Sequence, residues 1–387
     1  MDYRRAWAEI DMGHLVNNVR AVRGAIPKRT QLLAAVKADA YGHGSVEVSR
    51  ALLENGADIL GVALCEEGIK LRKNGVTAPI LVMSYTPDPL LEEAVAHGLM
   101  LTIFSAEGYK ALAKAAALQG KKAEVHIKID TGMGRLGFLP GADSVDKICS
   151  ILQEPSLKIV GIYTHFATSD ALDASFMYEQ YARFKHMLSL LDARGVPVEG
   201  WVKHTGNSGM LAQTLRKGFS APDFDMFMDM VRIGVMLYGL PPSEELSFVC
   251  DTLRLKPVMR LKTRVSMTKT LPPGSGVSYG HLFHTHRETL VATLPIGYAD
   301  GYPRLLSNKG KVFVKNYTAP IIGAICMDQC MVDVTDVPDA KTIKPGEVVT
   351  MFGEAGPSAE ELAAQIGTIG YELVCGIGKR VPRVYLP

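Results

Sequence analysis

Short apolar runs rich in β-branched residues alternate with amphipathic stretches from the start of the chain to about residue 240. Eight of these runs have the length and composition of strands, at residues 32–37, 59–64, 79–84, 99–104, 124–130, 158–165, 201–204 and 230–235. Helical spacing of apolar residues is found near 14–25, 45–55, 66–74, 88–97, 106–119, 142–153, 174–194 and 207–216. Eight alternating units over such a length predict parallel strands in a TIM-type (β/α)8 barrel, with a doubly wound open sheet as the alternative.

The pattern changes after residue 240, where PPSEEL (241–246) is typical of a linker. Turn residues then separate short strand candidates at 257–270, 289–296, 310–315, 319–326 and 347–352, which predicts a mostly β domain. A further strand, WAEID (7–11), precedes the barrel and can pair with that domain. We therefore predict an α/β protein in three parts: an N-terminal strand (1–12) that packs with the β domain, a barrel (13–240) and a C-terminal β domain (241–387).

Composition and charge narrow the choice of partners and compartment. The 387 residues include 42 Lys+Arg and 40 Asp+Glu, a net charge of +2, which gives no electrostatic reason to bind nucleic acid or an anionic membrane. Six cysteines show no disulfide framework, and the close pair Cys326 and Cys330 has no histidine at a zinc-like offset, so we predict reduced thiols and no metal. The first residues do not resemble a signal peptide, and no apolar run is long enough to span a bilayer, so we expect a cytoplasmic protein.

Polar residues follow the predicted barrel strands at the end where such barrels carry their chemistry. Lys37 directly follows the apolar run 32–36, and a desolvated lysine there has a lowered pKa and can form a Schiff base. The alternative is an ordinary lysine at the barrel rim. Asn207 and Ser208 open a predicted helix, and Gly234 and Val235 leave the last strand. Backbone N–H groups at those two places can hold a phosphate, although small residues also simply make tight turns.

A glycine pattern after the fifth strand, Gly132-x-Gly134-x-x-Gly137, matches a dinucleotide-binding motif. Pro140 stands where the helix of that motif would run, and the motif belongs to a first rather than a fifth strand. A lysine and a phosphate site on one barrel instead suggest pyridoxal 5′-phosphate, which needs both.

The sequence resembles the alanine racemase family, the fold-type III pyridoxal phosphate enzymes. The resemblance covers almost the whole chain in family order, through AVKADAYGHG (35–44), KIDTGMGRLGF (128–138), YTHFATSD (163–170), MVRIGVMLYGL (230–240), VSYGHLF (277–283), PIGYADGY (295–302), GAICMDQCMVDVT (323–335) and GYELVCGIGKRVPRVY (370–385). No single motif carries the resemblance, and the combination is specific.

The resemblance implies which residues bind the cofactor. Lys37 occupies the position of the lysine that bonds pyridoxal phosphate, and Arg232 that of the arginine facing the pyridine nitrogen. His165 matches a histidine bonded to that arginine. The phosphate ligands implied are Tyr41, Asn207, Ser208, Gly234, Val235 and Tyr371.

The resemblance also implies substrate-binding residues and a homodimer with shared sites. Arg135 matches the arginine near the substrate carboxylate, and Lys128 matches a lysine that many members carry as a carbamate. Four further residues match ones supplied by the partner subunit: the second catalytic base Tyr279, Met327, whose backbone N–H meets the substrate carboxylate, the substrate-binding Asp328, and the entryway residue Tyr298.

The implied activity is the interconversion of L-alanine and D-alanine by two bases on opposite faces, Lys37 and Tyr279, which supplies D-alanine for peptidoglycan. The alternatives are a serine or dual alanine/serine racemase, another barrel enzyme such as a decarboxylase or a racemase for a basic amino acid, and a non-catalytic pyridoxal phosphate protein. Arg232 argues against a decarboxylase, since those generally pair an acidic residue with the ring nitrogen. Residues 209–229 are longer than the family pattern and have no role that the sequence reveals.

Overall fold

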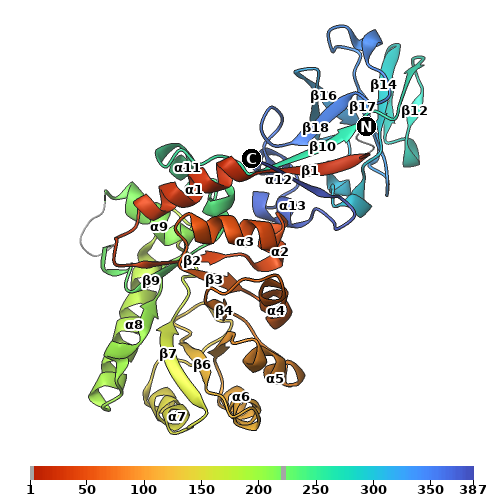
Figure 1. Ribbon diagram of the computed structural model, residues 1–387. Coiled ribbons are helices and arrows are strands. Elements are labelled where there is room, and N and C mark those ends of the chain that lie inside the picture. Colours follow the sequence, from red (N-terminus) through yellow and green to blue (C-terminus); the bar gives the residue numbers. More distant parts are fainter. Residues whose placement is uncertain (1–3, 219–223) are drawn as a thin grey trace.

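The computed structural model describes residues 4–218 and 224–387, which fold around two large sheets (Figure 1). The first sheet has eight parallel strands in the order β8-β7-β6-β5-β4-β3-β2-β9. Its strands are β2 (Gln31–Ala35), β3 (Ile59–Val62), β4 (Ile80–Val82), β5 (Met100–Ile103), β6 (Ala123–Lys128), β7 (Leu157–Tyr163), β8 (Val202–His204) and β9 (Met230–Ile233). Bonds from Asp229 N to Lys203 O (3.1 Å) and from Arg232 N to Gly206 O (3.0 Å) bring its outer strands together. The predicted barrel is confirmed, and the open sheet is wrong.

Helices surround the barrel strands, as the alternation predicts (Figure 1). Side-chain caps begin several of them: Asp11 Oδ1 accepts His14 N (2.9 Å), and Ser105 Oγ accepts Gly108 N (3.2 Å). The helices are α1 (Met12–Gly24), α3 (Ser45–Glu54), α4 (Cys65–Lys73), α5 (Asp88–Ala96), α6 (Ala106–Leu118), α7 (Ala142–Leu152), α8 (Ser175–Ala193) and α9 (Ser208–Arg216). The long segment 209–229 begins within α9 and runs on beyond the end of that helix. Its residues 219–223 lie outside the described part.

Strand alternation divides the barrel interior into layers. Every second residue of a strand points to the same face. On β9 this places Met230 and Arg232 together, and on β2 Leu33 and Ala35. Met230 and Leu33 pack with Ile59, Leu81 and Met100 in an apolar cluster separate from the main core. One step further along β5 and β9 the inward side chains are polar, Thr102 and Arg232, so the apolar cluster lies directly beneath them.

The second sheet has nine strands in the order β11-β14-β17-β16-β15-β18-β10-β1-β19. Its strands are β1 (Ala6–Asp11), β10 (Met259–Arg264), β11 (Met267–Leu271), β14 (Thr289–Leu294), β15 (Lys311–Val314), β16 (Tyr317–Ile322), β17 (Cys330–Asp333), β18 (Val348–Phe352) and β19 (Arg383–Leu386). β1 pairs antiparallel with β10 and parallel with β19, so both ends of the chain meet in this sheet.

One expected strand, 257–270, is two strands in the structure. Val265 N bonds to Glu347 O (2.8 Å) and Ser266 N to Thr293 O (2.8 Å), so the chain changes neighbours at this point. β10 therefore pairs with β18, and β11 with β14. A continuous β-like composition does not reveal such a crossing. The strands β17 and β19, and the small hairpin of β12 (Gly276–Val277) and β13 (Phe283–His284), were not predicted from the sequence.

Short helices complete the C-terminal part: α11 (Phe248–Thr252), α12 (Ala359–Ala364) and α13 (Gly370–Cys375). Of these, α13 packs against α2 (Lys37–Tyr41), the turn that follows the first barrel strand. Within the described ranges, no helix is both long and apolar enough to cross a membrane.

Candidate active site

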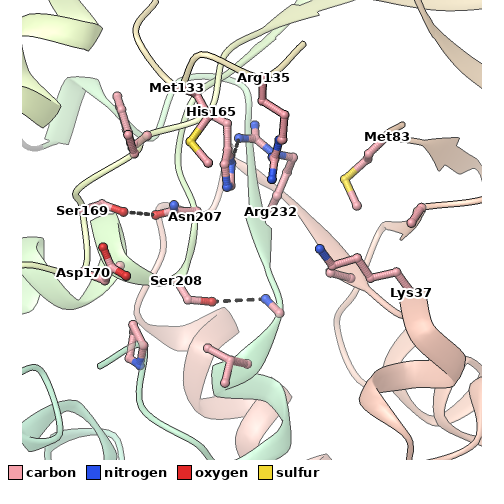
Figure 2. Close-up of a pocket in the computed structure, with 18 of the residues that line it drawn as sticks. Lys37, Met83, Met133, Arg135, His165, Ser169, Asp170, Asn207, Ser208 and Arg232 are labelled. Carbon is pink, nitrogen blue, oxygen red and sulfur yellow. Dashed lines mark hydrogen bonds between the residues drawn. The ribbon is translucent and has the colours of Figure 1, made fainter. Parts of the chain in front are cut away.

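A cavity of about 410 Å³ opens at the carboxyl ends of the barrel strands (Figure 2). It contains eleven of the residues predicted for the cofactor and substrate site. These are Lys37, Tyr41, Lys128, Arg135, His165, Asn207, Ser208, Arg232, Gly234, Val235 and Tyr371. The parallel strands bring them together because all their carboxyl ends lie at one end of the barrel.

Lys37 is held by an unusual backbone turn. The four residues after it, Ala38 to Tyr41, have φ between 51° and 57°, which is the left-handed region. Such a conformation costs about 1–2 kcal/mol for each residue with a side chain. The surroundings compensate: Ala38 N donates to Glu67 Oε1 (2.6 Å), and Asp39 Oδ1 accepts bonds from Ser45 N (3.0 Å) and Lys70 Nζ (2.7 Å). The sequence prediction of a strand through Lys37 missed this turn.

Gly42 ends the turn and gives a testable prediction. Its φ is +81°, and a Cβ there would overlap the carbonyl oxygen of Val374 in α13. We expect Gly42→Ala to lower the free energy of unfolding by about 2–4 kcal/mol, from strain and overpacking together. Denaturant unfolding measures this. Gly24→Ala is the control, because Gly24 ends α1 and a methyl group added there would have no neighbour within 4 Å. Equal effects of the two changes would contradict the assigned role of the turn.

The two lysines of the cavity have lowered pKa values. Burial lowers the pKa of Lys37, and the charge of Arg135 lowers it further. Burial also holds the pKa of Lys128 well below its usual range, together with the charges of Arg232 and Arg135. Lys128 Nζ lies 4.3 Å from the ring centre of Tyr163, and the described residues offer it no hydrogen bond or ion pair. Both amines are therefore shifted toward the neutral form.

Arg232 lies at the centre of a buried layer of polar groups inside the barrel and is held there by several hydrogen bonds. Its Nη1 donates to His204 Nδ1 (2.8 Å) and His204 O (3.1 Å). Its Nη2 donates to the carbonyl oxygens of Thr164 (2.7 Å) and Thr205 (3.0 Å), and to His165 Nδ1 (3.2 Å; Figure 2). Burial lowers its pKa to about 10, so it stays protonated at neutral pH. Within the described ranges its Nε–H has no acceptor, which leaves one donor for a bound molecule.

Two buried histidines extend this layer below Arg232. Because His204 Nδ1 accepts from arginine, its Nε2 carries the proton and donates to His126 Nδ1 (2.8 Å). Burial lowers the pKa of His126 to about 3 and that of His204 well below its usual range, so both are neutral. Tyr163 stacks on His204 at 4.5 Å. Sequence reasoning assigned no role to His126 or Tyr163, although their inward positions on β6 and β7 were the available signal.

The part of the cavity around Ser208 and Gly234 has the backbone geometry of an anion-binding site, which we call the anion cradle. Ser208 begins α9, where backbone N–H groups are free, and its Oγ accepts a bond from Gly234 N (3.2 Å; Figure 2). Asn207 Oδ1 caps the same helix through Met210 N (2.9 Å). A Cβ on Gly234 would stand 2.5 Å from the hydroxyl oxygen of Tyr41, so only glycine leaves this space open.

The glycine pattern 132–137 does not bind a dinucleotide in the expected way. Asp130 accepts the backbone N–H groups of Gly132 (2.9 Å), Gly134 (3.0 Å) and Arg135 (2.8 Å), which folds the loop around its carboxylate. The chain then returns to pair with its own strand, since Phe138 N bonds to Lys128 O (2.9 Å). The loop serves to carry Arg135 over the cavity.

The four remaining predicted residues lie in the C-terminal part and do not line this cavity. Tyr279, Met327 and Tyr298 are 73%, 53% and 41% exposed. Asp328 accepts a bond from Arg380 Nη2 (2.6 Å). Within one copy of the chain the structure therefore does not bring Tyr279 to Lys37.

Comparisons with known proteins agree on one family. The family model for the alanine racemase N-terminal domain matches residues 10–242, and that for the C-terminal domain matches residues 258–385. An alanine racemase of Clostridium perfringens is 42% identical over 385 residues, which are 99% of this chain and 95% of that protein.

Solved structures give the same result. The alanine racemase of Clostridium difficile 630 has a TM-score of 0.91 and 38% identity, covering 100% of this chain and 97% of that one. The alanine racemase of Bartonella henselae, solved with covalently bound pyridoxal phosphate, has a TM-score of 0.85 and 30% identity over 99% of this chain and all of that one. The chain therefore belongs to the alanine racemase family of isomerases.

Proposed function

We propose that this chain interconverts L-alanine and D-alanine with pyridoxal 5′-phosphate bound in the barrel cavity. The observation that carries the proposal is one cavity that joins the amine of Lys37, the free Nε–H of Arg232 and the cradle at Ser208 and Gly234. The covalent pyridoxal phosphate in the Bartonella henselae relative supports it.

The residues present fit this cofactor. The unpaired Nε–H of Arg232 suits the pyridine nitrogen, which is an acceptor. The N-terminus of α9 and the hydroxyls of Tyr41 and Ser208 suit a phosphate dianion, and the bond from Gly234 N to Ser208 Oγ orients that hydroxyl. When bound, pyridoxal phosphate makes the Cα–H bond of an amino acid acidic. Asn207, Val235, Tyr371 and His165 line the same cavity, and we assign them to cofactor binding as well.

Racemisation requires a proton to leave one face of Cα and another to arrive at the opposite face. We propose Lys37 as the base on one face, because its lowered pKa allows it to accept a proton near neutral pH. We propose Tyr279 of the partner subunit in a homodimer as the base on the other. Its exposed position, away from the cavity of its own chain, suits a residue that completes a neighbouring site.

Substrate binding follows from the charges at the cavity mouth. Arg135 is presented by its Asp130-centred loop and suits the alanine carboxylate. We propose that the backbone N–H of the partner's Met327 completes this carboxylate site, that Asp328 of the partner subunit also contributes to substrate binding, and that the partner's Tyr298 lines the entryway. Exposure of Met327 and Tyr298 in the single chain supports an interface there.

The biological setting of this proposal rests on family membership. We propose a cytoplasmic enzyme that supplies D-alanine for peptidoglycan. We also propose that the chain divides functionally into an N-terminal strand (1–12), a catalytic barrel (13–240) and a C-terminal β domain (241–387). The family models, which match 10–242 and 258–385, support this division.

We propose that Lys128 is carbamylated, and this gives a pH-dependent prediction. A carbamate would place a negative charge between Arg135 and Arg232, the two cations whose charges act on Lys128. Only a neutral amine reacts with carbon dioxide, so the lowered pKa of Lys128 favours carbamate at neutral pH. As pH falls through that pKa, the amine takes up a proton and the carbamate is lost.

Carbon-13 NMR in labelled bicarbonate measures this directly. We expect a carbamate signal at neutral pH that disappears reversibly on acidification, at pH values well below the 10.5 of an ordinary lysine. Lys128→Met should remove the signal, and Lys158→Met, which alters an exposed lysine, should keep it. An unchanged signal in Lys128→Met would disprove the assignment.

The test of the whole function is exchange of the Cα proton in D₂O. The cofactor-loaded enzyme receives L-alanine, L-serine, L-lysine or L-arginine in separate samples, and proton NMR and optical purity are followed. We expect fast exchange and loss of optical purity with alanine alone. Equal rates with serine would broaden the substrate to both, since a hydroxymethyl group is hard to exclude by size. No exchange despite bound cofactor would overturn the proposal.

A further inference from the structure

A second cavity, of about 340 Å³, lies where the barrel meets the C-terminal sheet, and we call it the junction cavity. Within the described ranges it shares no lining residue with the active-site cavity. Segments from both halves of the chain form its wall. The lining residues used below are His43, Tyr238, Leu240, Met259, Phe352, Ala359, Glu360 and Val374.

The wall of the junction cavity is mostly apolar and well ordered by packing. Leu240, Met259, Phe352, Ala359 and Val374 are all buried. They come from five separate stretches of the chain, each fixed by the core on its other side. Both the volume and the apolar wall are those of sites for small organic molecules.

His43 presents an unsatisfied acceptor at this cavity. It is 1% exposed. Its Nδ1 lies 3.0 Å from Ala40 O and 2.9 Å from Tyr41 O, and since both are carbonyl oxygens, Nδ1 carries the proton. Burial lowers the pKa of His43 to about 4, so the ring is neutral and Nε2 keeps a lone pair. No donor for Nε2 is found in the described part of the chain.

A second acceptor determines the charge that the cavity can accept. Glu360 Oε1 is buried without a hydrogen-bond partner within the described ranges. Glu354 also lines the cavity but is paired with Arg260 Nη1 (2.8 Å), and Lys256, the one lysine or arginine among the described lining residues, is exposed. An anion would meet the buried Glu360 carboxylate and the histidine lone pair, whereas an N–H or O–H donor would satisfy His43 Nε2.

We propose that the junction cavity binds a small aromatic or branched-alkyl molecule, neutral or cationic, with an N–H or O–H group that donates to His43 Nε2. The apolar wall holds the body of the molecule, and the buried acceptor selects for the donor. A molecule of equal shape without a donor leaves His43 unpaired and binds less well.

The junction cavity is connected to the cofactor site through aromatic packing. The His43 ring lies 4.7 Å from that of Tyr238, which lies 4.9 Å from that of Tyr41. His43 also belongs to the turn that carries Tyr41 and Lys37. Occupancy of the cavity should therefore change the dissociation of pyridoxal phosphate, and this consequence rests on the proposed role of Tyr41 in phosphate binding.

The test uses indole and its carbon analogue indene, which differ in the N–H group. Saturation-transfer NMR on the cofactor-loaded enzyme measures the dissociation constant of each. We expect indole to bind about fivefold more tightly than indene, the effect of one hydrogen bond. His43→Phe should abolish this difference. Saturating alanine should leave indole bound, because alanine occupies the other cavity.

A matched pair of variants locates the site. Ala359→Leu fills the junction cavity and should remove binding of both probes, whereas Ala364→Leu makes the same change on the exposed side of α12 and should not. The proposal is overturned if indole does not bind the wild-type enzyme or is displaced by alanine. It is also overturned if indole binds the Ala359→Leu variant as well as it binds the wild type. His43→Phe is interpreted only if its thermal unfolding matches that of the wild type.

Cofactor release is measured separately, by dialysis with and without indole. We expect the release rate to change in the wild type and not in Ala359→Leu. Normal indole binding with unchanged release would refute the connection and leave the site established. Failure of pyridoxal phosphate to bind at all would instead refute the proposed function.

Discussion

Lys37→Ala and Tyr279→Phe should each abolish racemisation, and mixing the two variants should restore part of it. Each single variant removes one of the two proposed bases, for which we expect a loss of at least about a thousandfold. In a mixed dimer one site contains both altered residues, and the other contains Lys37 from one subunit and Tyr279 from its partner, both intact. Random reassociation should return about a quarter of the wild-type activity.

This outcome follows from the position of Tyr279. It is 73% exposed and does not line the cavity that contains Lys37, so the two residues can act together only across an interface. The measurement is alanine racemisation after the two variants are denatured and refolded together or co-expressed with separate tags. Tyr317→Phe is the control, because Tyr317 is also an exposed tyrosine of the C-terminal part, on strand β16, and should retain full activity. If the mixture stays inactive while mixed dimers are present, the shared site is refuted.

The alternation of apolar runs was sufficient to predict the barrel, because each strand needs a buried face and each helix covers it. The eight predicted strands correspond to β2 through β9, and the eight predicted helices to the long helices around them. The C-terminal sheet was harder to predict. The split between β10 and β11 arises because β10 pairs with β18 and β11 pairs with β14. Both partners are distant in sequence, so local composition contains no information about this pairing.

In the active-site cavity, too, some features follow from the local sequence pattern and others depend on distant parts of the chain. Residues at strand ends could be predicted to converge, because parallel strands end at one rim. The left-handed turn at Ala38–Tyr41 could not, because no glycine marks those four positions and the turn is stabilised by Glu67 and Lys70 from elsewhere in the chain. The bond from His204 to His126 also depends on strand register, which brings two buried rings together across β6 and β8.

Arg232→Glu should lower racemisation by about 10²–10³-fold and raise the share of turnovers that end in transamination. In the wild type the guanidinium keeps its proton, with a pKa of about 10, and Arg232 lines the cavity with an Nε–H that has no acceptor within the described ranges. Arg232 would hold the pyridine nitrogen of the cofactor without giving up its own proton, and so would keep that nitrogen unprotonated and shorten the time for which the substrate lacks its Cα proton. A carboxylate at position 232 would let the pyridine nitrogen take up a proton, which would give the substrate without its Cα proton more time for side reactions.

Chromatography of the cofactor measures this, as pyridoxamine phosphate formed per racemisation. Arg232→Lys separates charge from shape: it keeps the positive charge but loses the planar fork that reaches His204, Thr164 and Thr205. We expect it to lose activity without the rise in transamination. Arg216→Glu, the same charge change at an exposed position of α9, should alter neither quantity. If Arg232→Glu binds the cofactor and leaves the ratio of the two reactions unchanged, Arg232 does not control reaction specificity, and its role is limited to holding the barrel's polar layer together.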